Sequence, residues 1–382
     1  MVDPIIIIGS GLAGFNTAKE IRRHDADIPV IMLTADDGNN YSKPMLSTGF
    51  TRSKQADELI MASPEKLAEQ FQLEVRPHQV VTAIHPAEKA ISLENGEKLA
   101  YSQLVLATGA QVFNPALEGD GLEAVYTVNN LMDYRVFRAA LEGKKRVAII
   151  GSGLIGTEFS NDLINGGFEV HVVEPAGRCL PTFLPEEASR AVSGALSDLG
   201  VTFHFGPFAQ KVEKTADGVC VHLSDGSTID ADIVLSAIGL QPNVSLAKEA
   251  GLNINRGVVT DSFLRTSDAN IYALGDCAEV EGNVLLYVLP LMAAARALAQ
   301  TLTGTETAVK YASMPITIKT PACPVVCAPP ALEVEGRWEI EEEGRTIRAL
   351  FYDKENALRG FALTGDAVKE RMALAKQLPD LL

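Results

Sequence analysis

The chain has 382 residues and a net charge of −16, with 47% hydrophobic and 21% charged residues, a composition typical of a globular protein with more than one core. Its five cysteines are too few for a disulfide scaffold and favour the reducing cytoplasm, and the first residues lack the features of a secretory signal. The acidic charge argues against nucleic acid as the main partner, and no apolar run reaches the ~18 residues of a membrane span.

A strand, a glycine-rich turn, a helix and a second strand open the chain. Ile5–Ile8 is a continuous run of β-branched residues, as in a parallel strand that is buried on both faces. The turn at 9–14 has glycine at its first, third and sixth positions, and a helix at 16–23 and a strand at 29–33 follow. This order predicts a βαβ unit.

The same pattern returns about 140 residues later, which is the spacing of a whole domain and not of a solenoid repeat. The second unit has a predicted strand at 146–150, a glycine turn at 151–156, a helix at 158–165 and a strand at 169–173. Further buried strands are predicted at 104–107, 233–238 and 270–274, and Asn95-Gly96 and Asp225-Gly226 predict hairpin turns.

Each glycine turn has the residues that a dinucleotide site needs. The first glycine permits a tight turn, the second lets backbone N–H groups approach a pyrophosphate, and the third lets the helix pack closely on the strand. The N-terminus of the helix adds partial positive charge. One such motif is weak evidence, but two at domain spacing, each between a strand and a helix, predict two dinucleotide sites.

An acidic residue follows the second strand of each unit. Glu174 lies about 18 residues past the turn, where a carboxylate accepts hydrogen bonds from a ribose 2′-hydroxyl and repels a 2′-phosphate. The second site is therefore predicted to prefer NADH, although Arg178 could still meet a 2′-phosphate. In the first site, Asp36 is the candidate for binding the ribose. The alternative interpretation is that Asp36 is an ordinary solvated carboxylate in a loop.

The last part of the chain, from about Met314, is proline-rich as far as Pro330. Strands at 345–352 and 358–363 and a helix at 367–377 predict a small α+β domain. Cys323 and Cys327 stand four residues apart, but a tetrahedral metal site needs two more ligands. We interpret them as structural thiols and predict no metal site.

With its two glycine turns, the strand-and-glycine segments between them and Gly275-Asp276, the chain resembles the pyridine-nucleotide flavoprotein reductases over essentially its whole length. The resemblance implies an α/β fold with two nucleotide-binding Rossmann-like domains, the first for FAD and the second for NAD(H). A small C-terminal domain closes the flavin site. The implied FAD domain comprises residues 1–113 and 242–313, the NAD domain residues 114–241, and the C-terminal domain residues 314–382.

The resemblance also implies which residues contact the two cofactors. The implied FAD contacts are Gly9, Ser10, Gly11, Leu12, Ala13, Gly14, Asp36, Lys43, Val81, Thr108, Gly109, Gly275, Asp276, Val288 and Lys319. The implied NAD contacts are Gly151, Gly153, Ile155, Gly156, Glu158, Glu174 and Gly239.

The segment Tyr41-Ser42-Lys43-Pro44-Met45-Leu46-Ser47 is similar to the Tyr-x-Arg-Pro-Pro-Leu-Ser-Lys segment of ferredoxin reductases. Thiol reductases of the family place a redox cysteine pair here or in the NAD domain, and this chain has neither. Thr48 replaces the lysine that in relatives pairs with a carboxylate at the position of Glu158, so that ion pair is either remade by Lys43 or lost. Lys43, Glu158 and Lys319 are the catalytic candidates, because an ammonium group near the flavin favours its anionic reduced form.

Within the family, segments 34–38, 41–49, 275–279 and 318–324 are most similar to those of the reductases that serve rubredoxin in alkane oxidation. The resemblance implies a cytoplasmic enzyme that moves hydride from NADH to flavin N5 and then two single electrons to rubredoxin, a small iron protein, which feeds an alkane hydroxylase. Two alternatives stay open: an NADH-dependent reductase of ferredoxin or flavorubredoxin, and a flavin-bound NADH sensor.

Overall fold

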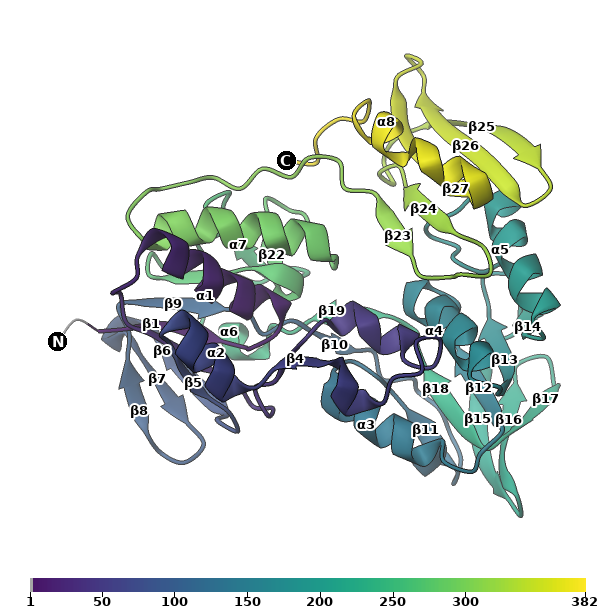
Figure 1. Cartoon of the computed structure of the whole chain (residues 1–382), viewed down its shortest axis with the longest axis horizontal. Helices are drawn as coiled ribbons and strands as arrows, with labels where there is room; N and C mark the ends of the chain where they lie inside the picture. Colours follow the sequence, from purple (N-terminus) through teal and green to yellow (C-terminus); the bar gives the residue numbers. More distant parts are fainter. Residues whose placement is uncertain (1–2) are drawn as a thin grey trace.

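Three five-stranded sheets organise the computed structural model of the chain, which describes residues 3–382. Figure 1 shows the first sheet at the left beneath α1 and α7, the second at the lower right, and the third, in yellow-green, at the upper right. The predicted α/β class with two nucleotide-binding units and a small C-terminal domain is confirmed. Among the helices of the described residues, none combines the length and the apolar character that crossing a bilayer requires.

The first sheet is entirely parallel, in the order β21-β9-β1-β2-β5. Its central strand β1 is fully covered, with Ile5, Ile6 and Ile7 at 0% exposure, because helices α1 and α7 pack together on one side and a three-stranded antiparallel sheet, β6-β7-β8, lies on the other (Figure 1). The elements are β1 (Ile5–Ile8), α1 (Leu12–His24), β2 (Val30–Leu33), β5 (Glu74–Arg76), β6 (Val81–His85), β7 (Ala90–Leu93), β8 (Lys98–Ala100), β9 (Gln103–Leu106), β21 (Ile271–Ala273) and α7 (Val288–Leu302).

The second sheet repeats this plan in the order β11-β18-β12-β13-β14, again entirely parallel. A three-stranded antiparallel sheet, β15-β16-β17, accompanies it. The elements are β11 (Val125–Tyr126), α3 (Leu131–Ala140), β12 (Arg146–Ile150), α4 (Leu154–Asn165), β13 (Glu169–Glu174), α5 (Glu186–Asp198), β14 (Thr202–Phe205), β15 (Ala209–Thr215), β16 (Gly218–Leu223), β17 (Thr228–Ala231) and β18 (Ile233–Ser236). Both predicted hairpin turns are confirmed: Gly96 and Gly226 join antiparallel strands with φ of +86° and +87°.

Both helices that follow a glycine turn begin earlier than the sequence predicts. Helix α1 starts at Leu12 and not at residue 16, and α4 starts at Leu154 and not at residue 158. In each unit the helix begins directly after the second glycine of the turn, which serves as its N-cap residue. The free N–H groups of the first helical turn therefore lie within the motif, where an anion would meet them.

The third sheet is antiparallel, in the order β23-β24-β27-β26-β25. The sequence predicts β26 (Thr346–Asp353) and β27 (Leu358–Thr364) but misses β23 (Ile316–Ile318), β24 (Val325–Ala328) and the acidic edge strand β25 (Gly336–Glu343). The predicted helix at 367–377 is confirmed only over residues 371–375. A 3-10 helix, η6 (Gly365–Glu370), precedes a short α8 (Arg371–Ala375), and Pro379 then disfavours further helix at the residue before it.

The remaining elements connect the three sheets. Strand β10 pairs antiparallel with β19, close to the two positions where the sequence predicts that the chain crosses between its nucleotide-binding domains; those domain boundaries remain predictions. The elements are β3 (Asn40–Tyr41), η1 (Lys43–Thr48), η2 (Ala56–Leu59), β4 (Ile60–Ala62), α2 (Pro64–Phe71), η3 (Pro86–Glu88), β10 (Ala110–Val112), η4 (Leu122–Ala124), β19 (Leu240–Pro242), α6 (Ser245–Glu249), β20 (Val258–Thr260), η5 (Gly275–Cys277) and β22 (Ala278–Val280).

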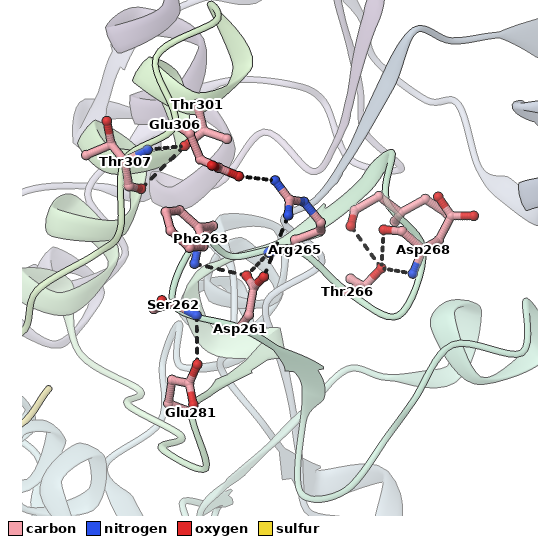
Figure 2. Close-up of polar contacts among 11 residues, drawn as sticks. Asp261, Ser262, Phe263, Arg265, Thr266, Asp268, Glu281, Thr301, Glu306 and Thr307 are labelled. Atoms are coloured by element: carbon pink, nitrogen blue, oxygen red, sulfur yellow. Dashed lines mark hydrogen bonds and ion pairs between the residues drawn. The ribbon is translucent and has the colours of Figure 1, made fainter.

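A polar network fixes the start of the segment that leads from α7 to the third sheet. Figure 2 shows Arg265 between Asp261 and Glu306. The Nη2 of Arg265 donates to Oε1 of Glu306 over 2.7 Å. A few residues on, the backbone N–H of Val309 donates to the carbonyl of Ser262 over 2.7 Å. The connection is thus held to the first nucleotide-binding unit before it reaches the third sheet.

Candidate cofactor and nucleotide site

A cavity of about 1130 Å³ is lined by residues from both strand–turn–helix units and from the first strand of the third sheet. The glycine turn after β1, the η1 segment, the first turns of α4 and α7, and β23 all contribute side chains or backbone to its wall. Its volume exceeds the ~300–1000 Å³ of most small-molecule pockets. It therefore has room for an extended ligand of dinucleotide size.

The three glycines of the first turn meet three different constraints. A Cβ at Gly9, where φ is +114°, would collide with the carbonyl oxygen of Ala107, and a Cβ at Gly14 would collide with the carbonyl oxygen of Gly9. A Cβ at Gly11 would meet nothing within 4 Å, and Gly11 lines the cavity. The outer glycines permit close packing, and the middle one leaves backbone N–H groups open to a ligand, as a pyrophosphate requires.

The second turn has the same geometry. A Cβ at Gly156 would collide with the carbonyl oxygen of Gly151, whereas a Cβ at Gly153 would meet nothing within 4 Å. Gly151 lines a second cavity of about 730 Å³ together with Glu174 and Ile238. The structure thus forms two separate hollows beside two equivalent strand–turn–helix units.

The two acidic residues occupy equivalent positions beside their turns. Glu174, 7% exposed at the end of β13, accepts hydrogen bonds from the backbone N–H and the Oγ of Ser152, at 2.9 and 3.1 Å. Asp36 accepts from the Oγ of Ser10 at 3.2 Å and from the Oγ1 of Thr34 at 2.6 Å. Each carboxylate is held against the residue between the first two glycines, where the ribose of a bound dinucleotide would lie.

Lys43 points its ammonium group into the wall of the large cavity. Its Nζ donates to Oδ1 of Asn129 over 2.7 Å, and Asp276 lines the same cavity. Burial lowers the pKa of Lys43, and the charges of Asp276 and Asp133 oppose that effect. Burial also raises the pKa of Asp276, opposed by Lys43. A bound cofactor would therefore meet a charged group that is only weakly hydrated.

The ion pair of Glu158 is made by Lys319, which corrects the expectation that Lys43 remakes it or that it is lost. The Nζ of Lys319, from the end of β23, contacts Oε2 of Glu158, and the backbone N–H of Lys319 donates to Oε1 over 3.0 Å. The Oγ of Ser47 donates to Oε2 over 2.7 Å. Glu158 is 3% exposed, so with Thr48 in place of a lysine its counter-charge comes from the third sheet.

One face of helix α4 holds backbone from two other parts of the chain. The carboxylate of Asp162 accepts from the N–H groups of Phe50 and Thr51 at 3.1 and 2.7 Å. The Oδ1 of Asn161 accepts from the N–H of Ala322 at 3.1 Å. Together with Glu158, these buried side chains fasten the η1 segment and the loop after β23 to the helix that begins at the second glycine turn.

The structure brings most of the predicted FAD contacts together. The large cavity is lined by Gly9, Ser10, Gly11, Leu12, Ala13, Asp36, Lys43, Val81, Thr108, Gly109, Asp276, Val288 and Lys319, and also by Ile155 and Glu158 from the predicted NAD set. Gly151 and Glu174 line the second cavity. Five of the predicted glycine contacts line neither cavity: Gly14, Gly153, Gly156, Gly239 and Gly275. Three of them, Gly14, Gly156 and Gly275, are packing positions where a Cβ would meet a neighbouring atom at under 3.0 Å.

Sequence reasoning missed three residues that hold the site together: Asn129, Asn161 and Asp162. Asn129 accepts a hydrogen bond from Lys43, and Asn161 accepts one from the backbone N–H of Ala322. Each pair is separated by more than 80 residues of sequence. Asp162 follows Glu158 by one helical turn, and that spacing on an apolar helix is the one signal that could have drawn attention to it.

The cysteines are isolated thiols. All five are free, and Cys323 and Cys327 are 2% and 0% exposed. Burial raises the pKa of Cys323 and raises that of Cys327 to about 12. Both thiols therefore stay protonated and unreactive near neutral pH.

Known proteins match the chain along its whole length. A family model described as pyridine nucleotide-disulphide oxidoreductase matches residues 3–308, and one described as rubredoxin binding C-terminal domain matches residues 308–378. The chain is 60% identical over 380 residues to the rubredoxin-NAD(+) reductase of Alcanivorax borkumensis, with 99% of each chain covered. It is 40% identical over 375 residues to the nitric oxide reductase FlRd-NAD(+) reductase of Aliivibrio fischeri, with 98% of each covered. A ferredoxin reductase structure from Rhodopseudomonas palustris has a TM-score of 0.88 at 28% identity, covering 99% of this chain and 95% of that one.

Proposed function

Because the chain belongs to the pyridine nucleotide-disulphide oxidoreductase family, which uses FAD and NAD(H), we propose that it oxidises NADH and passes the electrons singly to rubredoxin. The observation that carries the proposal is the position of Lys319. Lys319 lies in the region that the rubredoxin-binding model matches. It also lines the large cavity and pairs there with Glu158. The region that would receive rubredoxin therefore also forms part of the proposed flavin site.

The residues around the large cavity fit FAD. Gly11 leaves open space at the N-terminus of α1 for a pyrophosphate, Asp36 offers a carboxylate to a ribose, and Lys43 and Lys319 bring ammonium groups to the wall. FAD, when bound, would supply a group that accepts two electrons together from a hydride donor and can release them one at a time. The second cavity, with Glu174 at its wall, is where the adenosine part of NADH would bind.

The protein's own side chains position charge at the site. Lys43 places positive charge where a reduced, anionic cofactor would be stabilised, whereas the charge of Lys319 is offset by the carboxylate of Glu158. Asn129 accepts a hydrogen bond from the ammonium group of Lys43, and the charge of Asp276 acts on the same group. Glu158 pairs with the ammonium group of Lys319. Tyr287, whose pKa burial raises to about 12, lines the same cavity and stays protonated. With all five cysteines free, no cystine in the chain can receive the electron pair.

Anaerobic reduction of purified carriers tests this proposal. With NADH as the donor, we expect the protein to reduce rubredoxin with a kcat/KM at least about tenfold above that for a ferredoxin or a flavorubredoxin, a difference of ~1.4 kcal/mol, because residues 308–378 match the rubredoxin-binding model. Stopped-flow absorbance at the iron centre of each carrier gives the three rates. Faster reduction of either other carrier would replace rubredoxin as the partner.

The proposal extends to the setting of the reaction. We place the enzyme in the cytoplasm, which its free thiols support, and the reduced rubredoxin would feed an alkane hydroxylase. A sensor that binds FAD and NADH without turnover is the second candidate. Steady-state oxidation of NADH in the presence of catalytic amounts of the protein and excess rubredoxin would eliminate it.

A further inference from the structure

We propose that Asn129 is a positioning residue that fixes the ammonium group of Lys43 at the proposed flavin site. The inference rests on the proposed cofactor but not on the identity of the electron carrier. Its basis is a chain of contacts that joins Lys43, on the η1 segment, to the residues just before α3.

The amide of Asn129 can be oriented in one way only. Its Nδ2 donates to the carbonyl oxygen of Ala110 over 2.7 Å, so its Oδ1 faces Lys43 and accepts from Nζ over 2.7 Å. A lysine ammonium group has only donors, and the reverse orientation would set two donors against each other. The backbone N–H of Asn129 also donates to Oδ2 of Asp133 over 2.9 Å, which fixes the main chain at this point.

Lys43 needs such a partner because its side chain is long and only partly buried at the cavity wall. Four rotatable bonds would let the ammonium group leave the cavity wall, and an unpaired buried charge is costly. Asp276 and Asp133 act on Lys43 electrostatically, and Tyr41, Tyr287, Glu158 and Lys319 are further titratable groups on the wall of the same cavity. In the structure Asn129 is the group that accepts a hydrogen bond from Nζ.

A neutral acceptor has a specific advantage at this position. A carboxylate in place of the amide would hold Lys43 equally well but would cancel its charge. The amide fixes the direction of the ammonium group and leaves its positive charge available to a reduced, anionic cofactor. Asn129 would therefore raise the flavin midpoint potential through Lys43, without contacting the reacting atoms.

A double-mutant cycle on the FAD-loaded protein tests this role. The midpoint potential is measured with redox dyes and dithionite, without NADH or rubredoxin, for the native protein, Asn129→Ala, Lys43→Met and the double variant. We expect Lys43→Met to lower the potential and Asn129→Ala to lower it by a smaller amount. In the Lys43→Met background, Asn129→Ala should have no further effect, because residues that act through one another are not additive.

The neighbouring asparagine provides the control. Asn130 accepts a hydrogen bond from the backbone N–H of Asp133 and caps α3, so Asn130→Ala perturbs the same loop without touching Lys43. Its effect on the potential should be the same in the presence and absence of Lys43. If Asn129→Ala behaves like Asn130→Ala in this respect, or if Lys43→Met leaves the potential unchanged, the proposal is overturned.

The pH profile of the potential gives a second readout if Asn129→Ala loses its cofactor. Asn129→Asp keeps an acceptor beside Nζ and adds a negative charge, so it should raise the pH at which Lys43 loses its proton and move the corresponding change of slope to higher pH. An unmoved slope change would contradict the proposal. Since no electron carrier is involved, failure to reduce rubredoxin would overturn the proposed function and leave this inference standing.

Discussion

Replacing Lys319 by methionine should lower the stability of the protein by about 3 kcal/mol, the lower end of the range for removing one partner of a buried ion pair. The reason is that the carboxyl group of Glu158, 3% exposed, would keep its hydrogen bond from Ser47 but lose its counter-ion. Lys319 is itself 26% exposed, which keeps the effect from being larger. Thermal unfolding of the FAD-loaded protein measures it as a fall of about 3–6 °C in Tm.

Two variants show whether the loss comes from the unpaired charge. Glu158→Gln combined with Lys319→Met leaves no buried charge and should recover most of the Tm. Lys369→Met removes the lysine of an exposed pair with Asp366 in the same region, where both side chains are more than three-quarters exposed, and should change Tm by less than about 1 °C. A Tm for the double variant as low as that of Lys319→Met would mean that packing, and not charge, supports this contact.

Replacing Glu174 by alanine should lower kcat/KM for NADH about 30-fold, the equivalent of about 2 kcal/mol for a hydrogen bond to a charged group. The carboxylate lies at the wall of the second cavity, held by Ser152 and by the backbone N–H of Ala176 at 2.9 Å. NADPH should lose little or even gain, since the variant no longer repels its 2′-phosphate. Arg178 donates to the carbonyl of Pro181 over 3.2 Å and would have to leave this contact to reach a phosphate.

The measurement that tests this prediction is the ratio of kcat/KM for NADH to kcat/KM for NADPH. Steady-state kinetics with a small artificial acceptor give kcat/KM for NADH and NADPH in the native protein and in each variant. Glu169→Ala, at the exposed start of the same strand, should leave the ratio unchanged. An equal fall for both nucleotides in Glu174→Ala would show that Glu174 supports the fold of the turn and does not select the ribose.

The sequence is most informative where local rules dominate the structure. The run Ile5–Ile8, the glycine turns and the Asn-Gly and Asp-Gly hairpins fold as predicted, because burial and positive φ dictate these residue types locally. The first turns of α1 and α4 were missed because the glycine motif itself forms part of the helix. Strand β25 was missed because an edge strand exposes most of its residues, and half of the residues in Gly336–Glu343 are glutamate.

Contacts between distant segments are what the sequence alone does not specify. Lys43 and Lys319 are both catalytic candidates from the sequence, but only Lys43 is a candidate partner for Glu158 there. That Lys319 holds Glu158 depends on how the third sheet packs against α4. Asn129 carries no motif at all, and its importance follows from its two hydrogen bonds to Lys43 and Ala110. Pairwise geometry of this kind arises from tertiary packing and leaves no periodic pattern in the chain.

Because Lys319 supplies the counter-charge of Glu158, the C-terminal part of the chain cannot be exchanged freely between related reductases. A chimera that joins residues 3–313 of this chain to the last module of a relative lacking Lys319 would strand a buried carboxylate, since Thr48 offers no cation in exchange. The opposite graft, onto a relative with lysine at the position of Thr48, would crowd two ammonium groups around one acid. A graft that changes the residue at position 48 or at position 319 therefore needs the matching residue at the other position.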